Sequence, residues 1–235
     1  GKKISKSLGN VITAQKWLEF GNSKSILLLL YKRITGAREL GFDDIPGLMN
    51  EYNELEDTYF GRIKVDNQAK LTKLKGLYEY VNLLSPPKQS STHVNYRLLI
   101  ELTKIFKENR NERVMKKLID YGVIKEEGNQ EIEKLIEIAG NYSDEFDEQE
   151  KIEVELDATA KKAISLLITE LQKEEDPEDI QNTIYQIAKG NDVQPKDFFK
   201  ILYQIILGTS RGPKIGPFIT DIGRKQVAKT LAEYV

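Results

Sequence analysis

The sequence predicts an all-α protein, because apolar residues recur at helical spacing and strand-like alternation is almost absent. Leu48, Tyr52, Leu55 and Tyr59 follow one another at intervals of three and four residues, which places them on one face of a helix. Only Lys151–Leu156 alternates over several residues, so we expect at most one short hairpin.

Boundary signals divide the chain into helices. Thr13 suits the N-cap of a helix over 14–20, and Ser23 suits the N-cap of a second helix. The apolar run of that second helix, Ile26–Tyr31, should be buried nearly all round. Ser-Pro-Pro at 85–87 is the clearest linker. The other helices are expected over 45–60, 68–84, 93–108, 111–121, 129–140, 157–174, 178–189, 196–207 and 224–233.

Composition excludes several kinds of site. The 235 residues include no cysteine and one histidine, so neither a disulfide framework nor a cysteine-ligated or multi-histidine metal site can form. The longest apolar run is far too short to cross a bilayer, so we expect no membrane partner and a cytoplasmic protein. The formal net charge is −2, so any contact with RNA must come from a local basic patch.

The segment 126–155 is strongly acidic. It holds twelve Asp and Glu against two Lys, without an aromatic stripe. We expect a solvated face or a loose connector there, and because like charges repel RNA phosphates we place nucleic acid elsewhere.

The strongest chemical signal is the opening segment Lys3–Asn10, Lys-Ile-Ser-Lys-Ser-Leu-Gly-Asn. Two lysines three residues apart, with serine hydroxyls between and beside them, suit a loop that holds a polyphosphate. The lysines would neutralise charge that develops on pyrophosphate as an adenylate forms. The alternative is a disordered basic N-terminus, which the Gly-Asn and the helix that follow make less attractive.

Lys3–Ser7 resembles the KMSKS motif of class I aminoacyl-tRNA synthetases, with Ile4 in place of Met. In these enzymes the loop closes over ATP, and its lysines stabilise the transition state of amino-acid activation. The resemblance therefore implies that the full-length enzyme uses ATP with Mg²⁺. It implies ATP-binding residues Lys3, Ser5, Lys6, Ser7, Gly9 and Asn10, with Lys3 and Lys6 catalytic.

The partner motif of that class, a His-x-Gly-His sequence on the nucleotide-binding fold, is absent, since the chain has only His93. The chain also begins at Gly1 without a methionine, directly in the signature loop. We therefore expect a C-terminal fragment that runs from the KMSKS loop to the chain end, binds no cofactor and is inactive alone.

Three further stretches, Gly41–Gly61, Lys196–Gly208 and Arg211–Ile219, resemble archaeal-type class I lysyl-tRNA synthetases. The resemblance implies a monomeric lysine–tRNA ligase that takes tRNA-Lys, and ATP and lysine only as the full-length enzyme. It implies a KMSKS loop and stem-contact helices over 1–62, followed by a helical anticodon-binding cage of two subdomains, 63–155 and 156–235. Because that family often has serine where Lys6 stands, another class I synthetase such as the glutamyl enzyme stays open. So does a non-catalytic helical scaffold.

The C-terminal segment 208–235 carries the clearest local positive charge, five Lys and Arg against two Asp and Glu. Arg211 and Lys214 flank a Gly-Pro turn that would project both side chains, so we expect them to contact tRNA. Phe218 is close enough to stack on a base, although it could equally belong to the core. Arg38, near the opening loop, is a further candidate for the inner corner of the tRNA.

Overall fold

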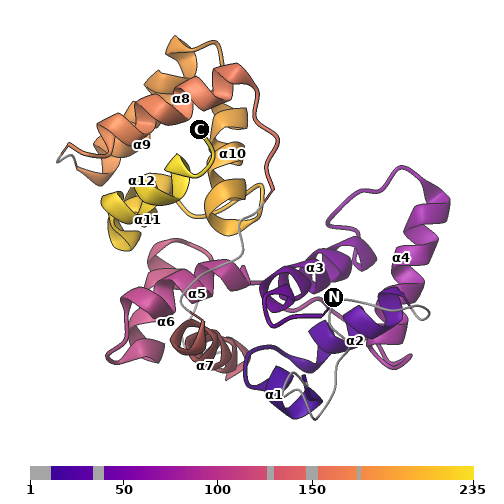
Figure 1. Ribbon diagram of the computed structural model, residues 1–235. Coiled ribbons are helices and arrows are strands. Elements are labelled where there is room, and N and C mark those ends of the chain that lie inside the picture. The colour runs from indigo at the N-terminus through magenta and orange to yellow at the C-terminus, as the bar shows by residue number, and fades with distance from the viewer. Residues whose placement is uncertain (1–11, 34–39, 126–129, 147–152, 174–175) are drawn as a thin grey trace. The chain divides into compact units, whose positions relative to one another are not determined.

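The computed structural model describes residues 12–33, 40–125, 130–146, 153–173 and 176–235 (Figure 1). These ranges contain twelve α-helices and no strand, which confirms the all-α prediction. Residues 153–156 are not extended into a strand, so the described part of the possible hairpin is absent. None of the helices in the described ranges has the length and hydropathy that crossing a membrane requires.

The chain forms two compact units, each built from two separate segments. Unit 1 comprises residues 1–100 and 129–149, and unit 2 comprises residues 101–128 and 150–235. The functional boundaries predicted after residues 62 and 155 divide the chain differently and stay predictions.

Unit 1 is a helical cluster in which α2 packs against α3 and α4, and α3 packs against α4. Its helix α5 continues across residue 100 into unit 2. The helices of this unit are α1 (Ala14–Leu18), α2 (Ser23–Lys32), α3 (Asp44–Tyr59), α4 (Gln68–Val81), the start of α5 (Tyr96–Ile105) and α7 (Gln130–Glu145).

The start of unit 1 confirms one predicted cap and corrects another. Thr13 Oγ1 accepts a hydrogen bond from Lys16 N at 3.1 Å, as expected of the N-cap of α1. In α2, however, the cap is Asn22, whose side chain accepts from Ser25 N at 2.8 Å. The prediction that α2 is buried all round is wrong, because α3 and α4 cover only part of it: Leu28 is fully buried, whereas Leu30 is 55% exposed.

Aromatic rings fill the part of unit 1 where α7 packs. Phe20 lies 5.1 Å from Phe146 and 5.5 Å from Phe42 between ring centroids, and Tyr142 lies 4.8 Å from Phe146. The Tyr96 hydroxyl donates to the Phe20 carbonyl. Of the two interpretations of the acidic segment, the described residues of α7 confirm the solvated face and not the loose connector, because α7 turns its acidic residues outward and buries an apolar face.

α4 ends three residues before the predicted end at 84. Leu83 and Leu84 both adopt left-handed backbone conformations, with φ of 54° and 58°, so they cannot continue the helix. Both side chains are exposed. The linker that follows, 85–95, returns the chain to α3.

Unit 2 is a second helical bundle, in which α9 contacts α8, α10 and α11, and α12 contacts α8, α10 and α11. Besides the end of α5, its helices are α6 (Arg110–Asp120), α8 (Ala158–Glu170), α9 (Pro177–Gly190), α10 (Pro195–Leu207), α11 (Ile215–Ile222) and α12 (Arg224–Ala232).

The helix α11 is missing from the sequence-based prediction. It is short and contains Gly216 and Pro217, residues that disfavour a helix interior. The structure gives the reason for the glycine: a Cβ on Gly216 would lie 1.9 Å from the carbonyl oxygen of Pro177. Only glycine allows α11 to approach the first turn of α9 this closely.

Candidate nucleic-acid interface

The loop between α10 and α11, residues 208–214, carries two of the predicted tRNA contacts. It begins at Gly208, which ends α10 in a left-handed conformation with φ of 68°. The Tyr203 hydroxyl, on α10, donates to the carbonyl of Pro213 at 2.5 Å. A Cβ on Gly212 would lie 2.6 Å from the Tyr203 ring, so this α10–α11 loop lies tightly against the helix.

Arg211 and Lys214 stand on this fixed loop with exposed side chains. Neither forms an ion pair with any residue that the structure describes. Such unpaired cations on a rigid support can meet phosphates without first losing a partner. Contact with tRNA at these two residues stays a prediction.

Phe218 lies in the core of unit 2. Its side chain has 0% exposure and meets the Tyr121 ring edge-on at 6.1 Å between centroids. A ring without exposed surface has no face to offer to RNA, so the stacking prediction is wrong and the core interpretation is confirmed. Phe218 belongs to the apolar face that α11 buries within unit 2.

A charged cluster beside Phe218 fastens α11 to α6 within unit 2. Lys117 Nζ lies 2.9 Å from both carboxylate oxygens of Asp221, and the Tyr121 hydroxyl donates to the same carboxylate. Burial and this neighbouring carboxylate raise the pKa of Tyr121 far above its ordinary value, so it remains a donor. Lys117 is therefore paired with Asp221 inside unit 2.

The signature loop Lys3–Asn10 and Arg38 lie outside the described residues. The predicted ATP-binding and catalytic roles of the loop, and the tRNA contact of Arg38, therefore stay predictions. Within the described ranges, no group of three or more His, Asp or Glu side chains could hold a metal ion.

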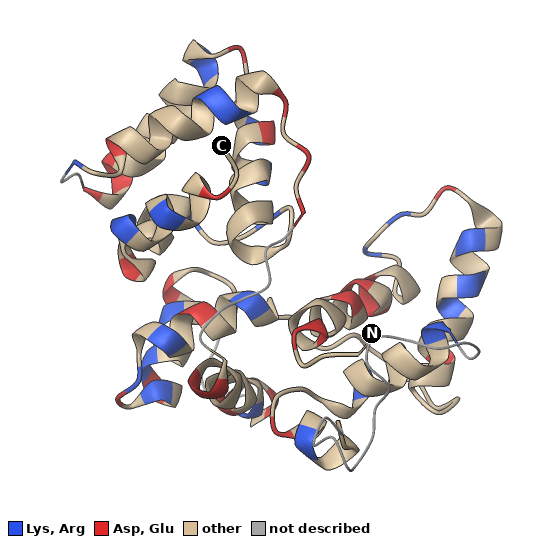
Figure 2. Cartoon of the chain, viewed as in Figure 1, with Lys and Arg blue, Asp and Glu red and all other residues tan. Residues whose placement is uncertain are grey.

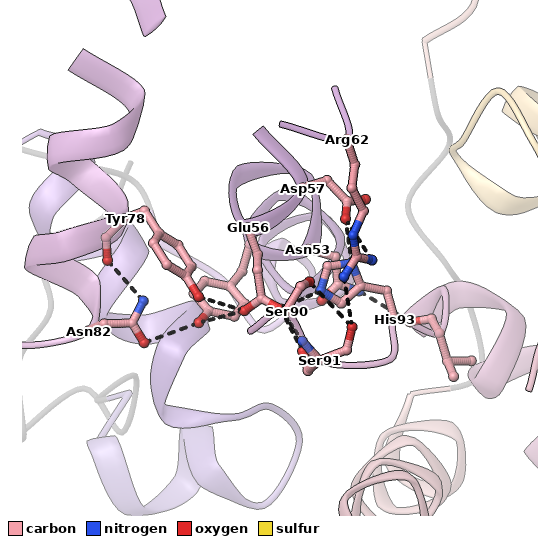
Figure 3. A network of polar contacts seen from close by, with 11 residues as sticks. Asn53, Glu56, Asp57, Arg62, Tyr78, Asn82, Ser90, Ser91 and His93 are labelled. Atoms are coloured by element: carbon pink, nitrogen blue, oxygen red, sulfur yellow. Dashed lines mark hydrogen bonds and ion pairs between the residues drawn. The ribbon is translucent and has the colours of Figure 1, made fainter. Parts of the chain in front are cut away.

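Unit 1 contains a buried carboxylate that sequence reasoning did not single out (Figure 3). Glu56, on α3, is 2% exposed. Its Oε1 lies within 2.7–2.9 Å of four donors: Ser90 Oγ, Ser91 N, Ser91 Oγ and His93 Nε2. Its Oε2 accepts from Tyr78 at 2.8 Å and from Tyr52 at 3.4 Å. We call these six residues the Glu56 cluster.

The electrostatics of the cluster keep Glu56 charged. Burial alone would raise the pKa of Glu56, but hydrogen bonds from His93, Ser91 and Tyr78 outweigh it and hold the pKa well below the ordinary value. Burial and donation to Glu56 raise the pKa of Tyr78 far above its usual range. The carboxylate thus ties the linker 85–95 and α4 to α3.

His93 adds two further contacts between the linker 85–95 and α3. Its Nε2 faces Glu56, and its Nδ1 lies 3.2 Å from Asp57 Oδ1. The side chain is 14% exposed, so most of its surface is covered within unit 1. The sequence could not reveal this contact, because 37 residues separate His93 from Glu56.

A pocket of about 920 Å³ opens beside the Glu56 cluster, within unit 1. Lys24, Asn53 and Lys134 are among the residues that line it. Burial lowers the pKa of Lys24, and the charge of Glu56 opposes that effect. Because donors surround both carboxylate oxygens of Glu56, this carboxylate acts as an anchor and not as a base toward the pocket.

Comparison with known proteins identifies the family of the chain. A family model described as "Anticodon binding domain" matches residues 98–235, more than half of the chain. The chain belongs to the anticodon-binding domain family. Ahead of that domain, residues 1–84 match the model described as "tRNA synthetases class I (K)". The two matches confirm the resemblance to class I lysyl-tRNA synthetases.

Several curated relatives of the chain are named as lysine–tRNA ligases. A "Lysine--tRNA ligase" of Cenarchaeum symbiosum is 53% identical over 97% of the chain and 43% of the relative. Ligases of the same name from Borreliella burgdorferi and Rickettsia prowazekii are 29% and 30% identical, over 100% and 99% of the chain and 47% and 44% of their own lengths. The chain thus spans less than half the length of these relatives.

Proposed function

We propose that this chain is the C-terminal, tRNA-binding part of a lysine–tRNA ligase that attaches lysine to tRNA-Lys with ATP and Mg²⁺. The observation that carries the proposal is the order of the two family matches, a class I synthetase segment followed by an anticodon-binding domain. The similarity of almost the whole chain to lysine–tRNA ligases supports lysine as the amino acid.

Within this proposal the two ends of the chain have different tasks. Lys3 and Lys6 act on the phosphates of ATP in the full-length, cytoplasmic enzyme, with Ser5, Ser7 and Gly9–Asn10 shaping the loop. Arg211 and Lys214 contact the tRNA backbone from the α10–α11 loop. We infer a monomer, and no amino-acid activation by this chain alone.

The first test is binding of the purified chain to tRNA-Lys and to the same tRNA with an altered anticodon. We expect tighter binding to tRNA-Lys in a filter-binding titration at fixed salt. Equal affinity for the two tRNAs would refute anticodon recognition, and the absence of any RNA binding would favour the scaffold alternative.

The α10–α11 loop is tested by replacing Arg211 and Lys214 together with glutamine. Two lost phosphate contacts should make the plot of log affinity against log salt shallower by about 1.5. The control replaces Lys161 and Lys162, exposed on α8, in the same way. An equal loss in the control would attribute the effect to net charge and contradict the assignment.

A further inference from the structure

A dense run of positive charge lies in unit 1, between the end of α3 and the middle of α4. Residues 62–75 contain five basic side chains and one acid, Asp66, in a chain whose formal net charge is −2. Figure 2 shows the basic residues along the α3–α4 loop and the N-terminal half of α4. We call this stretch the α3–α4 basic segment; its cations are Arg62, Lys64, Lys70, Lys73 and Lys75.

Only one of these five basic side chains forms an ion pair with a described residue. Arg62 is paired with Asp57, with 3.2 Å between Nη1 and Oδ1. The four lysines are all exposed, and none forms an ion pair with a residue in the described part of the chain. These lysines therefore play no visible role in holding unit 1 together.

The lysines also oppose the electrostatic preference of α4 itself. A helix is stabilised by acids in its first turns and by bases in its last turns. α4 has no acid in its first turn, where Lys70 lies, and no base in its last, where Glu79 lies. The Asn67 side chain caps the helix by accepting a hydrogen bond from Lys70 N. This cap offsets the unfavourable interaction of the lysines with the positive end of the helix dipole.

The arrangement of these lysines fits an extended polyanion better than one small anion. Lys70 and Lys73 are three residues apart and lie on neighbouring parts of the helix surface, whereas Lys75 is turned about 140° from Lys70. Lys64 stands on the loop before the helix. Charges that diverge in this way cannot close on a single phosphate, but they can meet several phosphates of a backbone.

We propose that the α3–α4 basic segment binds the RNA phosphate backbone, as a second RNA-contacting surface that lies on unit 1 and is separate from the α10–α11 loop of unit 2. The inference builds on the proposed function, which supplies tRNA as the polyanion. Its contribution is independent of sequence, because lysine and phosphate form point-charge contacts without reading a base.

The test replaces Lys70, Lys73 and Lys75 with glutamine in the full chain. Binding to tRNA-Lys and to a tRNA with an altered anticodon is titrated between 50 and 200 mM salt. We expect affinity for both to fall by roughly tenfold or more at the lower salt, and the salt slope to become shallower by about two. The ratio of the two affinities should not change.

The matched control removes the same charge from scattered exposed lysines, Lys88, Lys134 and Lys161. A loss as large in the control would overturn the proposal, because net charge alone would then explain it. Circular dichroism of each variant verifies that the helices are retained, and a Lys→Arg triple variant should restore binding to the wild-type level.

The outcomes also separate this inference from the proposed function. If the wild-type chain prefers tRNA-Lys and the triple glutamine variant binds as tightly, the basic segment is not an RNA surface although the function stands. If the variant loses affinity while the wild type shows no anticodon preference, the segment binds RNA and anticodon recognition fails. Loss of binding to vesicles rich in anionic lipid, with RNA affinity intact, would overturn the proposal in favour of a membrane.

Discussion

Unit 1 and unit 2 are both helical, but they are held together in different ways. In unit 1, the ionised Glu56 joins α3 to α4 and to the linker 85–95 through hydrogen bonds. In unit 2, α11 and α9 meet through backbone contact at Gly216, where a methyl group has no room. The first contact depends on charge and therefore on pH, whereas the second depends on shape alone.

This difference determines what each unit can tolerate. A buried carboxylate with all its donors in place is stable, but removing it strands several donors at once. A close approach of two backbones accepts no added atom. Each type of contact thus has its own sensitive substitution, and these substitutions should act on one unit and not on the other.

The largest effect is expected for Gly216→Ala. The added Cβ would meet the Pro177 carbonyl oxygen, so α11 and α9 must separate, at a cost of about 3 kcal/mol or more in the free energy of unfolding. Urea denaturation measures the loss, and hydrogen exchange should localise it to unit 2. Gly190→Ala is the control, because a Cβ there meets nothing within 4 Å. Equal stability of the two variants would contradict the close packing of α11 on α9.

Glu56→Gln should have the next largest effect, and in unit 1. The amide cannot accept from all the donors around Glu56, so we expect a loss of about 2–3 kcal/mol at pH 7. Glu54→Gln, an exposed change two residues earlier on the same helix α3, should leave stability nearly unchanged. Uniform loss of hydrogen-exchange protection in both units would contradict the expectation that the effect of Glu56→Gln is confined to unit 1.

The same carboxylate gives a pH dependence with a definite sign. Because the pKa of Glu56 is lowered in the folded protein, the unfolded chain binds the proton first as the pH falls below about 4.5. Its contribution is therefore complete above that pH and is lost progressively below it. Denaturation midpoints at pH 7, 5, 4 and 3 should fall less steeply for Glu56→Gln than for wild type. Parallel curves would remove Glu56 as the cause.

The smallest effect is expected at the α10–α11 loop. Tyr203→Phe removes the hydrogen bond to the Pro213 carbonyl and should cost about 1 kcal/mol. Burial raises the pKa of Tyr203 to about 12, so the hydroxyl stays a donor at neutral pH. If the loop must be fixed to present Arg211 and Lys214, tRNA affinity should fall slightly as well. Unchanged affinity together with reduced stability would mean that the loop presents Arg211 and Lys214 equally well without this hydrogen bond.

Apolar periodicity made much of the fold predictable. α3 begins and ends within one residue of its expected bounds, as does α10, because each repeats a buried face and begins at clear boundary signals. α11 was missed although Ile215, Phe218, Ile219 and Ile222 have helical spacing, because the Gly-Pro pair within it indicates a turn. The close approach that requires Gly216 involves α9, and local sequence does not contain that information.

The candidate site was less accessible from the sequence. Charge counting found Arg211 and Lys214 and could have found the α3–α4 basic segment, since the excess of lysine is visible without a structure. The Glu56 cluster could not be found in this way, because the partners of Glu56 other than Tyr52 lie 22 to 37 residues away along the chain. Nor could the burial of Phe218 be decided, since the same ring suits a core or a base stack.

The division of each unit into two segments has a consequence for how the protein is made. Unit 1 needs residues 129–149, which follow the first segment of unit 2 in the chain. A growing chain on the ribosome therefore cannot finish its first unit until the start of the second has already been synthesised. Tyr96 cannot contact Tyr142 until α7 has been synthesised. Helix α6 is likewise synthesised before α11, whose Asp221 pairs with Lys117 of α6. Unit 1 can accordingly complete its fold only after residue 149 has been synthesised, and unit 2 only after its second segment, 150–235, has followed.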